Sequence, residues 1–155
     1  VPVVFQGSFP IENTLFVTVD NYRGGCQATQ HLVDQGYRHI GHLSGPLKFS
    51  DAEARKSGWA DTLEKAGMHP TRAQWAEGDW SAASGARAIS KLLGSYPEMD
   101  AVFAANDQMA IGAVQKIHER GLQVPGDIAI IGYDNILITC FFQSTCPSFV
   151  ISNIE

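Results

Sequence analysis

The sequence lacks the marks of secreted and membrane proteins. It holds only three cysteines, Cys26, Cys140 and Cys146, and no C-x-x-C pair, which favours a reducing compartment over a disulfide framework. It has no run of about eighteen apolar residues, and its N-terminal VPVVFQGSFP has neither a basic segment nor a long apolar one. The sequence therefore predicts a cytoplasmic protein with no membrane contact.

Signatures of nucleotide binding and of nucleophilic catalysis are missing as well. The sequence has no G-x-x-x-x-G-K-[ST] phosphate loop, no G-x-G-x-x-G and no G-x-S-x-G elbow. His39 and His42 lie three residues apart on a predicted strand, so their side chains should point to opposite faces and not share a metal ion. One packed and one half-exposed histidine are expected instead. We predict no metal, no cofactor and no enzymatic activity.

Composition and charge indicate a folded binding protein. The 155 residues correspond to about one domain, and a content of 45% hydrophobic and 17% charged residues is typical of a globular core. The formal net charge is −5, which leaves no electrostatic footprint for nucleic acid in this chain. Any contact with DNA would therefore have to come from another part of a longer protein.

The clearest pattern in the sequence runs from Ala101 to Asn135 and reads as strand, helix, strand. Residues 101–104 and 128–131 are wholly apolar, as expected for strands of a parallel sheet covered by helices. Between them, Asn106 can cap a helix through its side-chain oxygen. The buried face of that helix is expected to carry Met109, Ala110, Ala113, Val114 and Ile117.

The rest of the chain repeats this alternation. Further strands are predicted at 1–5, 15–19, 39–44, 74–77 and 149–151. Further helices are predicted to begin at Asp20, Asp51 and Ser81 and to end at Gly36, Gly67 and Gly94, and the helix after Asn106 to end at Gly121. The alternation predicts an α/β fold with a doubly wound, mostly parallel sheet and helices on both faces.

Polar and aromatic side chains follow successive predicted strands, at the edge where open α/β sheets bind ligands. These residues are Ser44, Trp80, Asn106 and Asp134. Arg55 lies one turn into the next helix, and its side chain should lean back toward the same edge. Guanidinium, amide and carboxylate groups can satisfy paired hydroxyls, and an indole can cover an apolar ring face. The set therefore predicts a sugar site.

Other interpretations of these residues stay open at this point. Trp80 can belong to the core, and Arg55 can be a solvated surface charge. Asn106 and Asp107 can serve only as helix caps. Asp107 and Asp134 can also be a pair of carboxylates for acid–base catalysis, which would make the protein a small hydrolase.

Four ordered segments of the sequence resemble the effector-binding region of the lactose-repressor-like (LacI/GalR) family of bacterial transcription regulators, which has the periplasmic-binding-protein fold. The matching segments are VTVDNYRGGCQATQHLVDQGYRHIGHLSGP (17–46), ARKSGW (54–59), EGDWSAASG (77–85) and ANDQMAIGAVQKIHERGLQVPGDIAIIGYDN (105–135).

This resemblance implies a sensor that binds a sugar or another small metabolite between two lobes, and so changes the operator affinity of a separate helix-turn-helix head. It implies a homodimer without a membrane partner. By position, Arg55 matches the family's effector-binding arginine, and Trp80 the aromatic residue that stacks on the ligand. Asn106 matches the amide of the A-N-D motif and Asp134 the carboxylate of G-[YF]-D, while Ser44 and Asp107 are further candidate ligand contacts.

The resemblance also has limits along the chain. The matched segments correspond mainly to the C-terminal lobe, so we expect residues 1–155 to form a partial effector-binding domain, namely this lobe plus the crossover strands. No segment resembles the DNA-binding head or most of the N-terminal lobe. Gly7 offers no side chain where many members carry a polar pocket residue, and residues 136–155 depart from the family pattern. A periplasmic sugar receptor of a transporter is the alternative function within the same fold.

Overall fold

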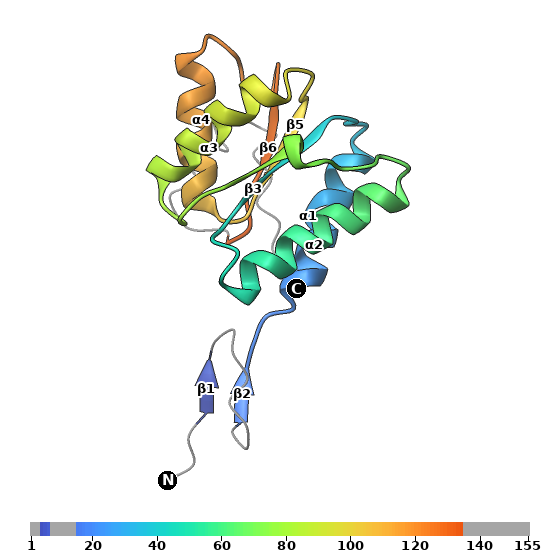
Figure 1. Ribbon diagram of the computed structural model, residues 1–155, viewed down its shortest axis with the longest axis vertical. Coiled ribbons are helices and arrows are strands. Elements are labelled where there is room, and N and C mark those ends of the chain that lie inside the picture. Colours follow the sequence, from blue (N-terminus) through green and yellow to red (C-terminus); the bar gives the residue numbers. More distant parts are fainter. Residues whose placement is uncertain (1–3, 7–14, 135–155) are drawn as a thin grey trace.

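The computed structural model of the protein describes residues 4–6 and 15–134 (Figure 1). Two short parallel strands, β1 (Val4–Gln6) and β2 (Leu15–Val17), form a small sheet of their own. The main sheet contains β3 (Ile40–Ser44), β4 (Trp75–Glu77), β5 (Ala101–Ala104) and β6 (Ala129–Ile131). The helices are α1 (Asn21–Asp34), α2 (Ser50–Lys65), α3 (Ala82–Ser95) and α4 (Asp107–Glu119), with a 3-10 turn at Arg72–Gln74.

The main sheet is parallel throughout, with the strand order β4-β3-β5-β6. The chain therefore steps outward from β3 to β4, crosses back to β5 and continues to β6. This reversal makes the carboxyl ends of β3 and β5 a topological switch point, where ligands of open α/β sheets bind. The predicted parallel sheet is confirmed.

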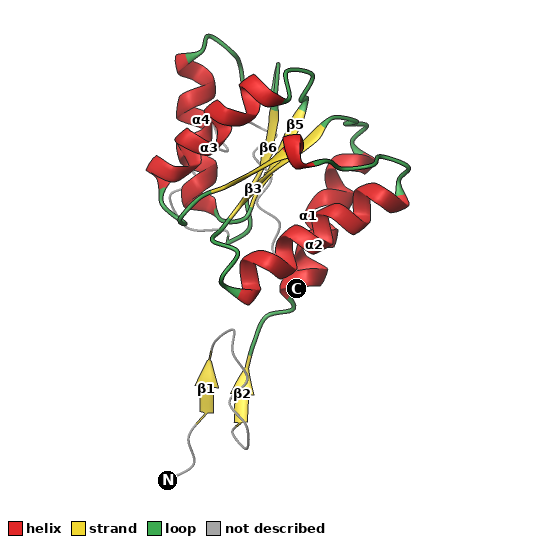
Figure 2. Ribbon diagram, viewed as in Figure 1, coloured by secondary structure: helices red, strands yellow, loops and turns green. Residues whose placement is uncertain are grey.

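Helices cover both faces of the sheet, as predicted (Figure 2). One buried cluster joins the sheet to α3 and α4, and the other joins it to α1 and α2. Residues of β3, β5 and β6 are buried along their whole length. This burial on both faces explains why β5 and β6 read as continuous apolar runs, while β3 also buries the polar side chains of His42 and Ser44. The predicted buried face of α4 is confirmed, with Met109, Ala110, Ala113, Val114 and Ile117 all buried.

Glycines let the helices of each layer approach closely. A Cβ atom on Gly25 of α1 would lie 2.3 Å from the carbonyl oxygen of Arg55 in α2. In the other layer, a Cβ atom on Gly112 of α4 would lie 1.8 Å from the carbonyl oxygen of Ala82. Both contacts need a residue without a side chain, so glycine fixes the distance between the helices that flank the site.

Most predicted helix ends are confirmed, and two predictions are wrong. Gly36, Gly67 and Gly121 follow their helices with φ of 95°, 76° and 76°, the left-handed conformation that ends a helix. Gly94 does not end α3, which continues to Ser95. Asp51 does not cap α2, because Phe49 is the cap residue and the Asp51 carboxylate accepts a hydrogen bond from Asn21 Nδ2 at 3.0 Å.

The two histidines of the H-x-x-H pattern lie in different surroundings. His42 is fully buried, stacked against Trp59 and Phe103 with ring centroids 5.4 Å and 4.8 Å away, and its Nδ1 lies 2.9 Å from the carbonyl oxygen of Phe103. Burial lowers the pKa of His42 to about 3, so the ring is neutral. His39 precedes β3 and is exposed, which is more open than the half-exposed position predicted.

None of the helices within residues 15–134 is long and apolar enough to cross a membrane. The predicted strand at 149–151 lies outside the described residues, as do Gly7, Cys140 and Cys146.

Candidate functional site

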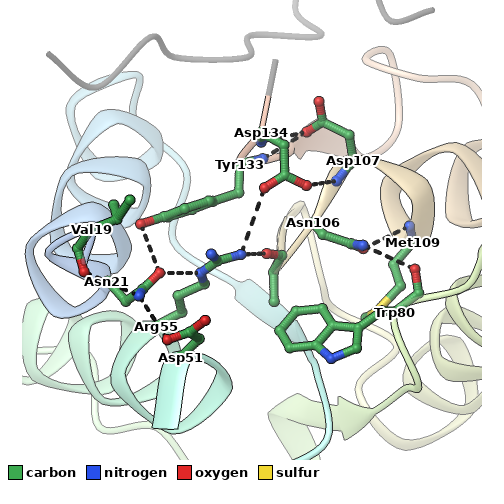
Figure 3. A network of polar contacts seen from close by, with 11 residues as sticks. Val19, Asn21, Asp51, Arg55, Trp80, Asn106, Asp107, Met109, Tyr133 and Asp134 are labelled. Atoms are coloured by element: carbon green, nitrogen blue, oxygen red, sulfur yellow. Dashed lines mark hydrogen bonds and ion pairs between the residues drawn. The ribbon is translucent and has the colours of Figure 1, made fainter. Parts of the chain in front are cut away.

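The structure brings four predicted site residues together at the carboxyl edge of the sheet. Trp80 follows β4, Asn106 follows β5 and Asp134 follows β6, while Arg55 reaches the same edge from α2. Figure 3 shows these side chains grouped around the guanidinium of Arg55. The site therefore draws on four separate elements, which the parallel sheet brings to one edge.

Arg55 is held on several sides. Its side chain is only 11% exposed. Its Nε donates a hydrogen bond to Asn21 Oδ1 at 2.8 Å, and its Nη1 donates to the carbonyl oxygen of Ala105 (Figure 3). The guanidinium carbon lies 3.5 Å from the ring centroid of Tyr133, and Nη1 lies 3.9 Å from Asp134 Oδ1. These contacts fix the plane of the guanidinium, so Arg55 is not a solvated surface charge.

The Trp80 indole completes the aromatic surroundings of Arg55. Its ring centroid lies 5.7 Å from the guanidinium carbon. Its backbone has φ of 73°, which is uncommon for a residue other than glycine and costs roughly 1–2 kcal/mol. A Cβ atom on Gly45 would lie 2.2 Å from the indole, so the ring rests directly on the backbone after β3. This strained, supported position is of the kind found at functional sites.

Asn106 links the start of α4 to Trp80. Its Oδ1 accepts a hydrogen bond from the Met109 backbone nitrogen at 3.0 Å, which confirms the predicted helix cap. Its Nδ2 donates to the carbonyl oxygen of Trp80 at 2.9 Å. The amide therefore holds the strained backbone of Trp80 in place. Among the described residues, these two bonds leave one Nδ2 proton and one lone pair of Oδ1 for other contacts.

Asp107 and Asp134 stand in different surroundings. Asp107 is fully buried, and its Oδ1 accepts hydrogen bonds from the backbone nitrogens of Tyr133 at 2.8 Å and Asp134 at 3.1 Å. The Asp134 carboxylate is 38% exposed beside Arg55. Partial burial raises the pKa of Asp134, and the charge of Arg55 opposes that shift. One carboxylate thus anchors a loop while the other faces outward, an arrangement that differs from two carboxylates facing a common reacting group.

Ser44 lies beneath this surface. It is fully buried at the end of β3, and its hydroxyl donates to the carbonyl oxygen of Gly45 at 2.6 Å. Its own carbonyl oxygen accepts from the Gly78 backbone nitrogen at 2.7 Å. Ser44 therefore lies under the loops that carry Trp80 and not among the exposed side chains.

Two residues of the site escaped the sequence analysis. Neither Asn21 nor Tyr133 is among the site residues predicted from the sequence. Both contact Arg55 directly, and the Tyr133 hydroxyl donates to Asn21 Oδ1 at 3.3 Å. The only sequence signal is their position, since each lies just after a predicted strand. Of the other tryptophans, Trp59 is buried in the core. Trp75 is partly buried, with Lys56 and Arg72 over its ring.

Comparisons with known proteins show which family the fold belongs to. A family model described as a periplasmic binding protein-like domain matches residues 29–149. The chain is 38% identical over 138 residues to the HTH-type transcriptional regulator CelR of Thermobifida fusca, a match that covers 87% of this chain and 41% of CelR.

Solved structures show the same likeness. A CelR–cellobiose complex is 38% identical with a TM-score of 0.81, over 87% of this chain and 42% of that one. A sugar-binding transcriptional regulator of the LacI family from Escherichia coli, complexed with phosphate, is 31% identical with a TM-score of 0.85, over 90% of this chain and 51% of that one. The chain thus spans about half or less of the length of these proteins.

Proposed function

The chain belongs to the family of periplasmic binding protein-like domains, in the form that LacI-type transcriptional regulators carry, and on this premise we propose that it senses a small effector, most simply a sugar. The observation that carries the proposal is the fixed guanidinium of Arg55 beside the outward carboxylate of Asp134 and the indole of Trp80. A charged fork, an acceptor and a flat apolar face match the hydroxyls and ring face of a sugar.

Each site residue has a separate part in this proposal. Arg55 and Asp134 donate to and accept from effector hydroxyls, Trp80 covers a ring face, and Asn106 offers the remaining groups of its amide. Asp107 and Ser44, which are buried, act on the effector through the loops that they hold. Because Arg55 is already ordered by the protein, little side-chain entropy is lost when the effector binds.

The wider function is part of the same proposal. Residues 1–155 supply the C-terminal lobe and the crossover strands of an effector-binding domain, and a second lobe closes over the ligand. A helix-turn-helix head outside this chain binds operator DNA, and the regulator works as a cytoplasmic homodimer without enzymatic activity. The effector changes operator affinity only as far as it binds one lobe arrangement more tightly than the other.

Thermal unfolding with a panel of ligands tests the sensing function. The panel contains cellobiose, ribose, galactose and, as a compound of another class, hypoxanthine. A sugar that binds the folded state should raise the unfolding midpoint, and a hundredfold excess over its dissociation constant corresponds to about 2.7 kcal/mol.

Variants of the same protein give this test its specificity. The shift should be lost in Arg55→Ala and Asp134→Ala. It should persist in Arg72→Ala, which removes an exposed arginine that lies over Trp75, outside the site. A panel without any shift, or a shift that survives Arg55→Ala, would contradict the proposal.

A further inference from the structure

The side chain of Asn21 joins the effector arginine to the chain that follows β2. We propose that Asn21 is a positioning residue, which sets the plane of the Arg55 guanidinium and ties it to the segment 17–20. This inference rests on the proposed function of Arg55. It adds a route by which movement of the connection between the lobes would reach the effector site.

The amide of Asn21 uses its whole hydrogen-bonding capacity. Its Oδ1 accepts from Arg55 Nε at 2.8 Å and from the Tyr133 hydroxyl at 3.3 Å. Its Nδ2 donates to the carbonyl oxygen of Val19 at 3.2 Å and to Asp51 Oδ1 at 3.0 Å. Because two donor and two acceptor positions are all filled, only one orientation of the amide satisfies them. Asn21 is 7% exposed, so water cannot readily replace these partners.

Two contacts together define where Arg55 points. The Tyr133 ring, 3.5 Å from the guanidinium carbon, limits tilting, and the hydrogen bond from Nε to Asn21 limits rotation within the plane. A hydrogen bond from a charged donor is stronger than one between neutral groups. Without Asn21, the long arginine side chain would regain other rotamers, and binding an effector would require ordering it again.

The other half of the Asn21 amide faces the connection from β2. Val17 and Val19 are 61% and 64% exposed, so few side-chain contacts hold this segment. The Val19 carbonyl oxygen accepts hydrogen bonds from both the backbone nitrogen and Nδ2 of Asn21. Asp20 caps α1 through the backbone nitrogen of Arg23. A change in the path of 17–20 would therefore shift Asn21 and alter its bond to Arg55 Nε.

The proposal can be tested without an effector, by solvent exchange of the Arg55 Nε proton in 15N NMR spectra of the 155-residue chain. The signal is assigned by its loss in Arg55→Lys. In the unmodified protein the proton should exchange slowly, and Asn21→Leu should speed its exchange about tenfold or more, as expected for loss of a hydrogen bond from a charged group. The double variant Asn21→Asp with Asp51→Asn keeps the acceptor oxygen for Arg55 and exchanges donor and acceptor between positions 21 and 51. It should restore slow exchange, which a general packing defect would not allow.

A matched control separates positioning from stability. Gln30→Leu removes an exposed amide of the same helix, bonded to Asp34, and should leave the Arg55 proton unchanged. Equal exchange in the unmodified protein and Asn21→Leu, or fast exchange in the double variant, would overturn the positioning role. If the positioning role is overturned but sugars still raise the unfolding midpoint in an Arg55-dependent way, the proposed function stands. If the Arg55 proton behaves as predicted but no sugar raises the midpoint, only the proposed function is contradicted.

Discussion

The side chains of Asp107 and Asp134 each accept a hydrogen bond from the other residue's backbone nitrogen, although the two residues lie 27 positions apart in the chain. Asp107 Oδ1 accepts from the Asp134 backbone nitrogen at 3.1 Å, and the Asp107 backbone nitrogen donates to Asp134 Oδ2 at 3.4 Å. A Cβ atom on Gly132 would lie 2.2 Å from Asp107 Oδ1, so the chain after β6 passes directly over this carboxylate. The first turn of α4 thereby fixes the loop that carries the outward carboxylate of the site.

Asp107→Ala should destabilise the protein strongly. The substitution leaves the backbone nitrogens of Tyr133 and Asp134 without their buried acceptor. The expected loss is about 2–6 kcal/mol of unfolding free energy, because two groups lose their acceptor and each unsatisfied buried group costs roughly 1–3 kcal/mol. Urea denaturation measures it. Asp127→Ala is the control, since the exposed Asp127 also accepts from a backbone nitrogen, that of Gln123, and its loss should cost about 1 kcal/mol or less. Equal losses would contradict this account of Asp107.

His42 should make the fold sensitive to mild acid. Its pKa is lowered to about 3 in the folded protein, while the unfolded chain binds a proton near the ordinary value of 6.5. The stabilisation is therefore fully present above pH 6.5 and is lost as the pH falls from 6.5 toward about 3. The slope from this one group is at most about 1.4 kcal/mol per pH unit.

His42→Phe isolates this contribution, because its ring can occupy the space between Trp59 and Phe103 without titrating. Unfolding free energies measured from pH 7 to pH 4 should fall less steeply in the variant. If the two proteins lose stability in parallel over this range, the buried histidine is not the cause.

Gly25→Ala should disturb both the fold and the site. The new methyl group would lie 2.3 Å from the Arg55 carbonyl oxygen, so α1 and α2 must separate, at a cost of roughly 1–3 kcal/mol. Gly94→Ala lies within α3 with nothing within 4 Å, and alanine should there stabilise the helix by about 0.5–1 kcal/mol. Chemical denaturation should show a lower unfolding free energy for Gly25→Ala and a higher one for Gly94→Ala. If both variants are stabilised, the close contact between α1 and α2 is refuted.

Most helices and strands were predictable because short stretches of neighbouring residues determine them. The run at 101–104 and the periodic face from Met109 to Ile117 belong to single elements, and the structure confirms both. Gly36 and Gly121 follow helices as predicted, because the left-handed conformation that ends a helix depends on the glycine itself and not on distant contacts. Gly94 failed as a helix end since a helix can run through a glycine when later turns remain bonded, as shown by the Tyr96 nitrogen donating to the Leu92 carbonyl.

The site was predictable only in part. Trp80, Asn106 and Asp134 were predicted because they follow strands, and Arg55 because it lies one turn into a helix. The family resemblance points to the same four residues. Asn21 and Tyr133 also follow strands, but no local pattern marks their contacts. The bond from Arg55 to Asn21 joins residues 34 positions apart, and the bond from Tyr133 to Asn21 joins residues 112 positions apart. Asp51 was wrongly predicted to cap α2 for the same reason. Its carboxylate binds Asn21 of α1, and that contact exists only once α1 packs against α2.

Quenching of tryptophan fluorescence by acrylamide tests the central claim most directly, because it reports whether a sugar lies against Trp80. Trp59 is buried and Trp75 packs outside the site, so a bound sugar should shield Trp80 above all. The account predicts that cellobiose, ribose or galactose reduces quenching in a saturable way, and that the effect disappears in Trp80→Phe and weakens about tenfold or more in Arg55→Lys. A saturable reduction that persists unchanged in Trp80→Phe, or no reduction with any of the three sugars, would contradict a sugar site at this edge of the sheet.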